Sequence, residues 1–244
     1  MGAPAFGKPI FSCEGVSLSL GGRRILDQLS LSVAPHEILG VIGPNGAGKT
    51  SLFEVLSGRY RPQQGKVRLR DEDITALPIH KRARLGIART FQSPVVPTAL
   101  TVGEVLKAAR EAFSPWLTRH HAEWACHLVG LKVPEDLPAG ALETLNRRKL
   151  LLACLVMRRP CVVLMDEPAA GLINSEIDEI DAIVRVLAKE MGMAVIVVEH
   201  RLELLAAIAD RIAVMDLGKK IAEGAPEHVF EDPAVRAAYF DVAA

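Results

Sequence analysis

The chain has 244 residues, a length that fits one large α/β domain with a sizeable buried core. Half of its residues are hydrophobic and 24% are charged, the balance of an ordinary globular protein. Its 29 Lys and Arg equal its 29 Asp and Glu, so no net positive field attracts a polyanion, and nucleic acid is disfavoured as a partner.

Cysteine usage and hydropathy indicate a cytoplasmic protein without its own membrane span. The four cysteines form no Cys-x-x-Cys pair and do not cluster with histidine, so we expect reduced core residues. The longest uncharged apolar run, residues 150–157, is far below the roughly 18 residues of a membrane helix. Residues 1–10 contain two prolines and no apolar signal-peptide core. Any membrane contact is therefore expected to go through a partner.

The first third of the chain predicts a β-hairpin followed by a strand, a turn and a helix. Apolar and polar side chains alternate before Gly21-Gly22 and again after it, as in two strands joined by a tight turn. A short apolar segment then opens into a glycine-rich turn. The elements expected here are strands over residues 10–20, 25–33, 37–43 and 65–70 and helices over residues 48–56 and 78–85.

The middle of the chain is mostly helical in pattern, and the last third alternates strands with helices. Two helical stretches are expected within residues 102–131, broken near Ser114-Pro115, and another over residues 142–157. Continuous apolar strands that alternate with helices indicate a parallel sheet covered on both faces. The elements expected in the last third are strands over residues 162–165, 194–198 and 212–215 and helices over residues 175–189 and 202–208.

Residues 43–50 read Gly-Pro-Asn-Gly-Ala-Gly-Lys-Thr and fit the phosphate-binding pattern G-x-x-x-x-G-K-[ST] between a strand and a helix. Glycines let backbone N–H groups converge on phosphate oxygens, and the helix N-terminus adds positive charge. We expect Lys49 to neutralise the β- and γ-phosphates and the Thr50 hydroxyl to ligate Mg²⁺. The residues expected to bind nucleotide are Gly43, Pro44, Asn45, Gly46, Ala47, Gly48, Lys49, Thr50 and Ser51.

A second group of polar residues is expected beside this turn. Residues 162–165 form an apolar strand that ends in Asp166 and Glu167, and ligands of parallel sheets lie at the carboxyl ends of strands. Asp166 is expected to hold Mg²⁺ through water, and Glu167 to polarise the water that attacks the γ-phosphate. His200 follows another buried strand and is expected to position this water. The side-chain amide of Gln92 is expected to reach the water or Mg²⁺. Alone, each of the latter two residues is a weak signal.

Together and in this order, these segments resemble the Walker A, Q-loop, Walker B and switch-histidine motifs of the ABC-transporter ATPases. The resemblance covers essentially the whole chain and implies ATP, Mg²⁺ and catalysis by Glu167, His200, Gln92 and Lys49. It implies an α/β P-loop NTPase fold with a mostly parallel core sheet, an antiparallel β subdomain and a helical subdomain. Residues 1–244 are then one domain, with its core over about 1–91 and 160–244 and its helical subdomain over about 92–159.

Residues 86–92, 166–172 and 232–240 are similar to the ATPases of branched-chain amino acid importers, a family with relatives for urea and short amides. Residues 77–84 also resemble the lipopolysaccharide-transport ATPase, although Arg-Thr-Phe-Gln at residues 89–92 favours the importer. The resemblance implies a peripheral position on the inner face of the membrane, held by permease subunits, with a substrate-binding protein as an indirect partner. Residues 92–110 are expected to help form the permease-docking groove, through Val95, Val96, Pro97 and Leu100.

The chain departs from the family at the segment that completes the partner's ATP site. Residues 142–146, here called the signature segment, read Leu-Glu-Thr-Leu-Asn where the family has Leu-Ser-Gly-Gly-Gln. The family's serine donates to the γ-phosphate, whereas Glu143 brings a carboxylate, a repulsion of about 4 kcal/mol at about 4 Å and an effective dielectric near 20. Leu145 is expected to add bulk where close approach is wanted. We therefore expect a heterodimer with a second ATPase whose segment is intact, and poor or no hydrolysis at the site that this segment faces. The alternative is that the family tolerates the change or that the alignment is shifted, in which case the change is harmless.

Milder departures concern the base and the contact between subunits. Leu20 stands where the family usually has an aromatic residue that stacks on adenine, and Phe11 is a candidate to replace it. Ile173-Asn174 replaces the family's usual Asn-Pro, and Arg201 replaces the usual Asp. These two changes put communication between subunits in doubt, but they do not affect the expectation of nucleotide binding.

Two other classes of function stay open. A soluble ABC ATPase of translation or DNA repair usually carries tandem cassettes or long coiled-coil insertions, and the sequence shows neither. A P-loop phosphotransferase would deliver phosphate to a substrate hydroxyl, whereas Glu167 beside Asp166, with His200, suits the activation of water. The sequence does not name the cargo, because the cargo is read by other subunits.

Overall fold

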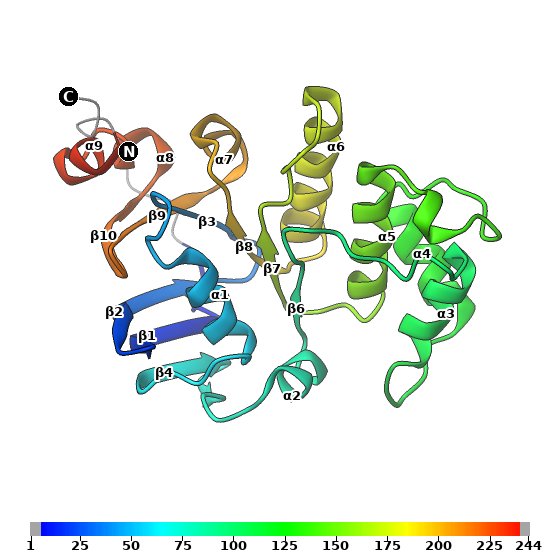
Figure 1. Ribbon diagram of the computed structural model, residues 1–244, viewed down its shortest axis with the longest axis horizontal. Helices are drawn as coiled ribbons and strands as arrows, with labels where there is room; N and C mark the ends of the chain where they lie inside the picture. Colours follow the sequence, from blue (N-terminus) through cyan, green and yellow to red (C-terminus); the bar gives the residue numbers. More distant parts are fainter. Residues whose placement is uncertain (1–5, 240–244) are drawn as a thin grey trace.

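The computed structural model describes residues 6–239, which form two sheets with helices around them (Figure 1). The six-stranded sheet has the order β10-β9-β3-β8-β7-β6 and is parallel apart from β10, which pairs antiparallel with β9. The antiparallel sheet has the order β2-β1-β4-β5. The strands are β1 (Phe11–Leu20), β2 (Arg23–Val33), β3 (Ile38–Ile42), β4 (Gln64–Leu69), β5 (Glu72–Asp73), β6 (Ile87–Arg89), β7 (Val162–Asp166), β8 (Ala194–Val198), β9 (Arg211–Asp216) and β10 (Lys219–Gly224).

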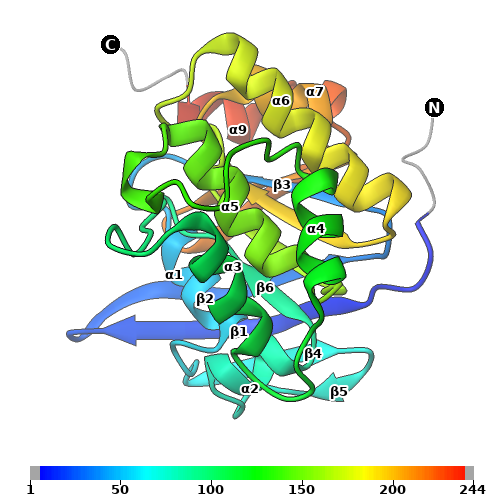
Figure 2. The ribbon, with the colours of Figure 1, turned by 90° about the vertical axis from the view of Figure 1, so that its right-hand side faces the viewer.

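Helices cover the parallel sheet, and α3, α4 and α5 pack against one another at one end of the molecule (Figures 1 and 2). The helices are α1 (Lys49–Ser57), α2 (Ile79–Arg84), α3 (Val102–Glu111), α4 (Arg119–Leu128), α5 (Thr144–Val156), α6 (Asn174–Arg185), α7 (Leu202–Ile208), α8 (Pro226–Val229) and α9 (Pro233–Tyr239). Within residues 6–239, no helix is both long and apolar enough to cross a bilayer.

Two hydrophobic cores lie on opposite faces of the parallel sheet, as the alternation of side chains along each strand requires. In β7, Val162 and Leu164 join the core that the antiparallel sheet and α1 share, whereas Val163 and Met165 join the core under α3 to α7. All five residues of β7 are buried, which is why its sequence is a continuous apolar run that ends in an acid.

Strand register brings three chain segments to one edge of the parallel sheet. Val198 of β8 is paired with Val41 of β3 on one side and with Asp166 of β7 on the other. The turn after β3, the acids that end β7 and the residues after β8 therefore leave the sheet side by side. This edge is where ligands of parallel sheets bind.

The expected fold class is confirmed, and several elements differ in their bounds. The helix expected over residues 142–157 begins only at Thr144, after a 3₁₀ turn over Ala139–Ala141. The helix expected over residues 175–189 is α6 followed by a π-turn over Val186–Glu190. The sequence did not predict β5, β6, β10, α8 or α9. The boundaries proposed for the core and the helical subdomain stay a prediction.

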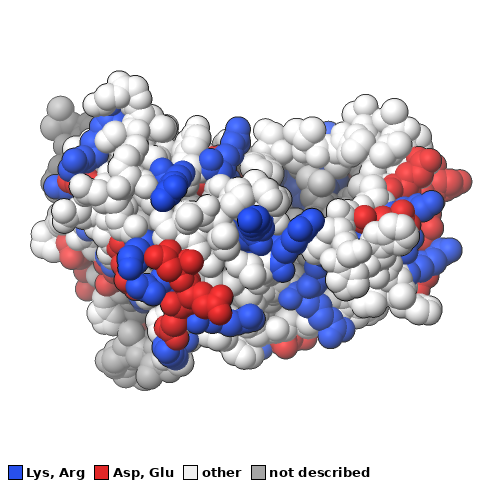
Figure 3. All heavy atoms as spheres, turned by 90° about the horizontal axis from the view of Figure 1, so that it is seen from below, with Lys and Arg blue, Asp and Glu red and all other residues white. Residues whose placement is uncertain are grey.

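Acidic and basic side chains are interspersed on the face of the molecule seen from below (Figure 3). This distribution agrees with a formal net charge of zero.

Candidate functional site

The turn between β3 and α1 has the backbone geometry of a phosphate cradle, and two of its glycines are required sterically. A Cβ on Gly43 would lie 2.4 Å from the carbonyl oxygen of Met215. Gly48 has φ 101°, and a Cβ there would lie 2.9 Å from the carbonyl oxygen of Ile25. No other residue type fits either position without a backbone shift, so the glycine spacing of the motif follows from packing against β2 and β9.

Lys49 begins α1, and its ammonium group lies within the turn. Its Nζ donates to the carbonyl oxygens of Gly43 at 2.6 Å and Pro44 at 3.1 Å. Burial lowers the pKa of Lys49, and the nearby carboxylates of Glu167 and Asp166 oppose this shift. The turn therefore holds a cation beside two acids, at the N-terminus of a helix, which is where a polyphosphate binds.

Asp166 ends β7 on the buried side of the edge and is 6% exposed. Its Oδ2 lies 3.5 Å from the guanidinium of Arg89, which lies 3.0 Å from Glu54 Oε1 in α1. Burial raises the pKa of Asp166, and the positive charge of Arg89 opposes the rise. Arg89 thus joins the helix after the phosphate turn to the strand that carries the acid.

Glu167 is held between two side chains from distant parts of the sequence. Its Oε2 accepts a hydrogen bond of 2.6 Å from the Gln92 amide, and its Oε1 lies 2.7 Å from His200 Nε2. The backbone of Glu167 has φ 46°, a left-handed conformation that an ordinary side chain adopts only at a cost of about 1–3 kcal/mol. Its N–H donates to the Val198 carbonyl at 2.9 Å, which holds the strained residue against β8.

One cavity of about 490 Å³ joins these groups. Of the residues predicted from the sequence, it is lined by Asn45, Gly46, Gly48, Lys49, Thr50, Ser51, Gln92, Glu167 and His200. Gly43, Pro44, Ala47 and Asp166 do not form part of this lining. The cavity is also lined by Arg23, Arg24, Ile25 and Leu217, which sequence reasoning missed because they belong to no motif.

The expectation that Phe11 replaces a missing aromatic residue is wrong. Phe11 is 1% exposed and packs in the core between the two sheets, so it cannot contact a nucleotide. Leu20 is 39% exposed and is not part of the cavity lining.

The donors at the site fit a magnesium ion that is bound together with phosphates. Within residues 6–239, no group of three or more His, Cys, Asp or Glu has the arrangement of a protein-only metal site. Mg²⁺ is usually bound by one or two carboxylates together with phosphates of the substrate and water. The hydroxyl of Thr50 in the cavity wall and the carboxylate of Asp166, one residue before the lining residue Glu167, are donors of that kind.

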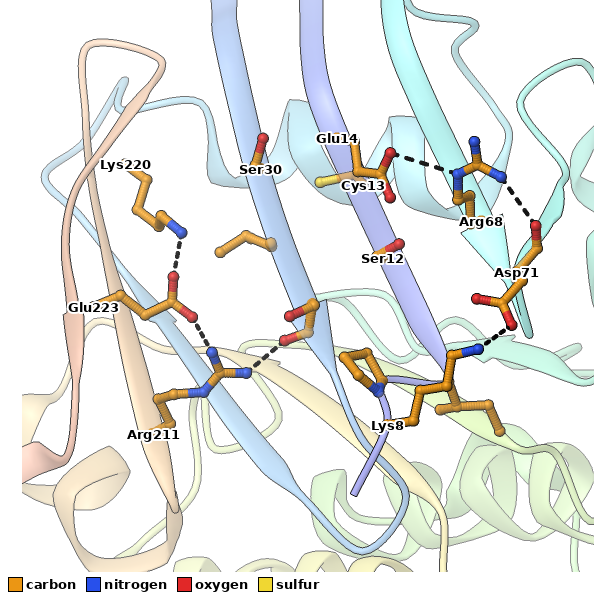
Figure 4. A pocket seen from close by; sticks show the side chains of 14 residues that line it. Lys8, Ser12, Cys13, Glu14, Ser30, Arg68, Asp71, Arg211, Lys220 and Glu223 are labelled. Atoms are coloured by element: carbon orange, nitrogen blue, oxygen red, sulfur yellow. Dashed lines mark hydrogen bonds and ion pairs between the residues drawn. The ribbon is translucent and has the colours of Figure 1, made fainter. Parts of the chain in front are cut away.

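A second cavity of about 410 Å³ lies on the outer face of the antiparallel sheet (Figure 4). Its charged side chains pair with one another: Arg211 and Lys220 with Glu223, Arg68 with Glu14, and Lys8 with Asp71. It contains no residue of the predicted motifs. Because each of its charged side chains is paired with an opposite charge, this cavity is not the candidate functional site.

Arg148 in α5 connects the helical region to the site, and no sequence motif indicates this role. Arg148 is 7% exposed. Its guanidinium donates to three backbone carbonyls, those of Gln92 at 3.4 Å, Glu167 at 3.3 Å and Ala170 at 2.5 Å. One buried cation therefore fixes the main chain on both sides of the Glu167 carboxylate.

The signature segment lies at the start of α5 and differs in part from the expectation. Leu142 and Leu145 are 4% and 8% exposed and pack in the core, so the side chain of Leu145 does not project from the surface. The steric part of the expectation for Leu145 is therefore wrong. Glu143 is exposed at the N-cap and makes no side-chain capping hydrogen bond. Its carboxylate remains the feature that would meet an anion in front of the helix.

The comparison with known protein families agrees with this geometry. The sequence model of the ABC transporter family matches residues 26–170. The chain belongs to this family. The ABC transporter family supplies the ATP-hydrolysing subunits of transporters, so the chain is an ATPase that binds nucleotide. Residues 219–240 match the model of a branched-chain amino acid ATP-binding cassette transporter.

Curated relatives within the ABC transporter family are similar over nearly their whole length. The branched-chain amino acid transport ATP-binding protein BraF of Pseudomonas aeruginosa is 35% identical, with 95% of this chain and 98% of BraF covered. LivG of Escherichia coli, of the same description, is 34% identical with the same coverage. The lipopolysaccharide export ATP-binding protein LptB of Haemophilus influenzae is 33% identical, with 94% and 96% covered.

Solved structures of ABC cassettes share the fold. The ADP conformation of MJ1267, an ATP-binding cassette of an ABC transporter, is 29% identical with a TM-score of 0.87, covering 96% of this chain and 99% of that one. A nucleotide-free ATP-binding cassette from an ABC transporter is 28% identical with a TM-score of 0.86, covering 96% and 99%.

Proposed function

We propose that this ABC ATPase powers the import of branched-chain amino acids or a related small polar solute. The observation that carries the proposal is the match of residues 219–240 to the branched-chain amino acid transporter model. These residues lie outside the ATPase motifs, so their similarity is separate from the chemistry that all ABC ATPases share. The similarity to BraF and LivG over 95% of the chain supports the same cargo class.

The cavity suggests how the chain's own residues would act in hydrolysis. Lys49 and the N-terminus of α1 would bind the β- and γ-phosphates. Thr50, Asp166 and Gln92 would hold Mg²⁺, which supplies positive charge to the phosphate oxygens. Glu167 would accept a proton from the attacking water, or orient it, while Gln92 and His200 keep both of its carboxylate oxygens in place.

His200 requires a particular protonation for this role. Its Nε2 lies 2.7 Å from the Glu167 carboxylate, so a proton on Nε2 makes the contact favourable. The side chain is 43% exposed, so it also faces the solvent side of the cavity, where a γ-phosphate would lie. His200 would therefore contact both the Glu167 carboxylate and the γ-phosphate and fix their relative positions.

The partner ATPase is proposed to differ from this chain. Two ABC ATPases would enclose each ATP between the cavity of one and the signature segment of the other. The exposed carboxylate of Glu143 at the N-terminus of α5 opposes a γ-phosphate there. A partner with an intact segment would complete the cavity of this chain, and the site that Glu143 faces would hydrolyse slowly.

The permease is proposed to dock in an apolar groove between α2, α3, α5 and β6. This docking groove has a volume of about 530 Å³ and is lined mainly by small and apolar residues, among them Ala83, Phe91, Ala109, Phe113 and Leu155. The residues expected from the sequence, Val95, Val96, Pro97 and Leu100, are not among its lining residues. Phe91 is 50% exposed there, one residue before Gln92. A helix inserted in the groove would contact the segment that leads to the catalytic cavity. Docking of this kind would place the chain at the inner face of the membrane.

Transport of labelled leucine, isoleucine and valine tests the cargo class. Cells that lack the gene are expected to lose uptake, and wild-type chain but not Glu167→Gln chain is expected to restore it. Undiminished uptake together with defective surface lipopolysaccharide would favour the export function that the similarity to LptB keeps open. Co-purification with ribosomes or DNA in place of membrane proteins would favour a non-transport ABC ATPase.

A further inference from the structure

We propose that Leu217 and Arg23, in place of an aromatic residue, form the binding site for the nucleotide base, here called the base seat. This inference rests on the proposed function, because it takes the cavity at the phosphate turn to be the ATP site. It assigns the part of the cavity that no motif accounts for: the cavity wall formed by Arg23, Arg24, Ile25 and Leu217.

The position of the base follows from the two chemically distinct parts of the cavity. Gln92, Glu167 and His200 surround the place of the terminal phosphate, and residues of the phosphate turn line the adjoining wall. The remaining lining residues lie at the start of β2 and in the turn between β9 and β10. A triphosphate in the turn therefore leaves this part for the ribose and the base. No Phe, Tyr or Trp of the described residues is among the lining residues.

Leu217 has the properties of a residue presented to a ligand. Among the described residues it is the second most exposed large hydrophobic side chain, 76% exposed, after Val95 at 80%. Its backbone has φ 44°, which a leucine adopts only with strain. An exposed leucine in a strained turn costs stability and gains nothing from the fold, whereas a bound base would bury its side chain.

The turn that carries Leu217 is attached to the phosphate turn on one side and to β2 on the other. The N–H of Gly218 donates to the Ala47 carbonyl at 3.0 Å, and its carbonyl accepts from Asp27 N–H at 2.9 Å. A Cβ on Gly218 would lie 2.4 Å from the Ile25 carbonyl oxygen, so the two segments are in direct backbone contact. The side chain of Leu217 is therefore held at a fixed position relative to the phosphates.

Arg23 supplies the second face. It is exposed at the start of β2, opposite Leu20 in the hairpin register. Arg24, by contrast, donates to Asp27 at 2.8 Å. A guanidinium plane stacks on a purine without reading its edge, and an aliphatic side chain gives apolar contact on the other side. The pair would perform the task that one aromatic ring performs in related proteins.

The test separates the base from the phosphates by calorimetric titration of the full chain with MgATP and with magnesium tripolyphosphate. Leu217→Asn removes the apolar contact and keeps a residue type that tolerates left-handed backbone, and Arg23→Lys keeps the charge without the plane. Each is expected to weaken MgATP binding about tenfold and to leave tripolyphosphate binding within about twofold. Leu85→Asn, the same change on another exposed leucine, is the matched control and should bind both ligands like the wild type.

Two results would overturn the base seat. The first is an MgATP affinity that is unchanged in both variants. The second is an equal loss of affinity for MgATP and for tripolyphosphate, which would mean that the substitutions act by disturbing the phosphate turn and not by removing contacts with the base. Failure of the phosphate-turn site, on which the proposed ATP hydrolysis depends, looks different, because wild-type protein would then bind neither ligand. A wrong cargo class would leave both titrations unchanged and would appear only in the uptake assay. If wild-type protein binds the two ligands equally well, the base adds no affinity. This result would overturn the base seat alone and would leave the phosphate site in place.

Discussion

Glu167 Oε1 lies 2.7 Å from His200 Nε2, although 33 positions of sequence separate the two residues. The contact exists because β7 and β8 are neighbours in register, which brings the residues after Asp166 and Val198 to the same edge. Gln92 holds the other carboxylate oxygen at 2.6 Å. The carboxylate is thus fixed before any catalytic step, and it is the group whose removal should affect hydrolysis more than binding.

Glu167→Gln is expected to lower ATP turnover in the assembled transporter by about 10²–10⁴-fold and to leave ATP affinity largely intact, because it removes the proton acceptor and keeps the shape. Phosphate release and MgATP titration measure the two effects. Glu190→Gln, at an exposed position, should hydrolyse like the wild type. Wild-type turnover in the Glu167→Gln assembly would contradict the role of this residue.

Glu143→Ser is expected to increase ATP-dependent self-association of the Glu167→Gln chain by at least about tenfold, because a carboxylate no longer opposes the γ-phosphate at the partner's site. Sedimentation with and without MgATP measures this change. Glu227→Ser changes an exposed acid in α8 and serves as the control. Equal self-association before and after the Glu143→Ser change would show that the signature segment does not impose an asymmetric dimer.

Ala83→Arg is expected to abolish co-purification with the permease while MgATP binding stays unchanged. Ala83 is exposed on α2 and lines the docking groove, so a long charged side chain there obstructs the groove without disturbing the core. Ala206→Arg makes the same change on the exposed face of α7, outside the groove. Normal recovery of the permease with Ala83→Arg would place the docking surface elsewhere.

Arg148→Met is expected to lower the free energy of unfolding by about 2–4 kcal/mol, because the carbonyl groups of Gln92, Glu167 and Ala170 lose a buried donor. Urea denaturation measures the change, and ATP turnover should fall as the Glu167 backbone loosens. Arg61→Met, at an exposed position, should change stability by less than about 0.5 kcal/mol. A variant as stable as this control would remove Arg148 from its positioning role.

The buried thiol of Cys13 should make stability fall at alkaline pH. Burial raises the pKa of Cys13 from 9.0 to about 12, so the unfolded chain releases this proton first as the pH rises. The contribution is complete below pH 9 and is lost progressively between pH 9 and pH 12. Cys13→Ala should therefore show a shallower loss of unfolding free energy over that range. An unchanged pH slope would contradict the burial effect.

The phosphate turn and the acids after β7 could be predicted from the sequence because their chemistry is local: consecutive residues carry the glycine spacing and the strand–acid pattern. Strand β6 could not, since three residues show no alternation and only pairing with β7 makes them a strand. The Arg148 contacts are invisible in sequence, because their acceptors are backbone carbonyls, which every residue has.

The base seat and the signature segment show two further limits of sequence reasoning. Leu217 has no motif around it, and its position depends on a turn attached to the distant Ala47. Leu145 packs inward against the expectation, because a helical residue faces the core or the solvent according to packing that one segment cannot specify. Glu143, by contrast, lies exposed at the helix start, as its charge suggests.

The pairing of Val198 with both Val41 and Asp166 couples nucleotide binding to folding of the whole chain. The groups around the cavity come from opposite halves of the polypeptide and meet only when the central strands have assembled. No proteolytic fragment from either half contains them all, so ATP binds the complete native state in preference to partly folded forms. By mass action, ligand at about a hundred times its Kd would add about 2.7 kcal/mol to the stability of the entire domain. Cellular ATP would thus protect the newly made subunit from proteolysis before it reaches the membrane.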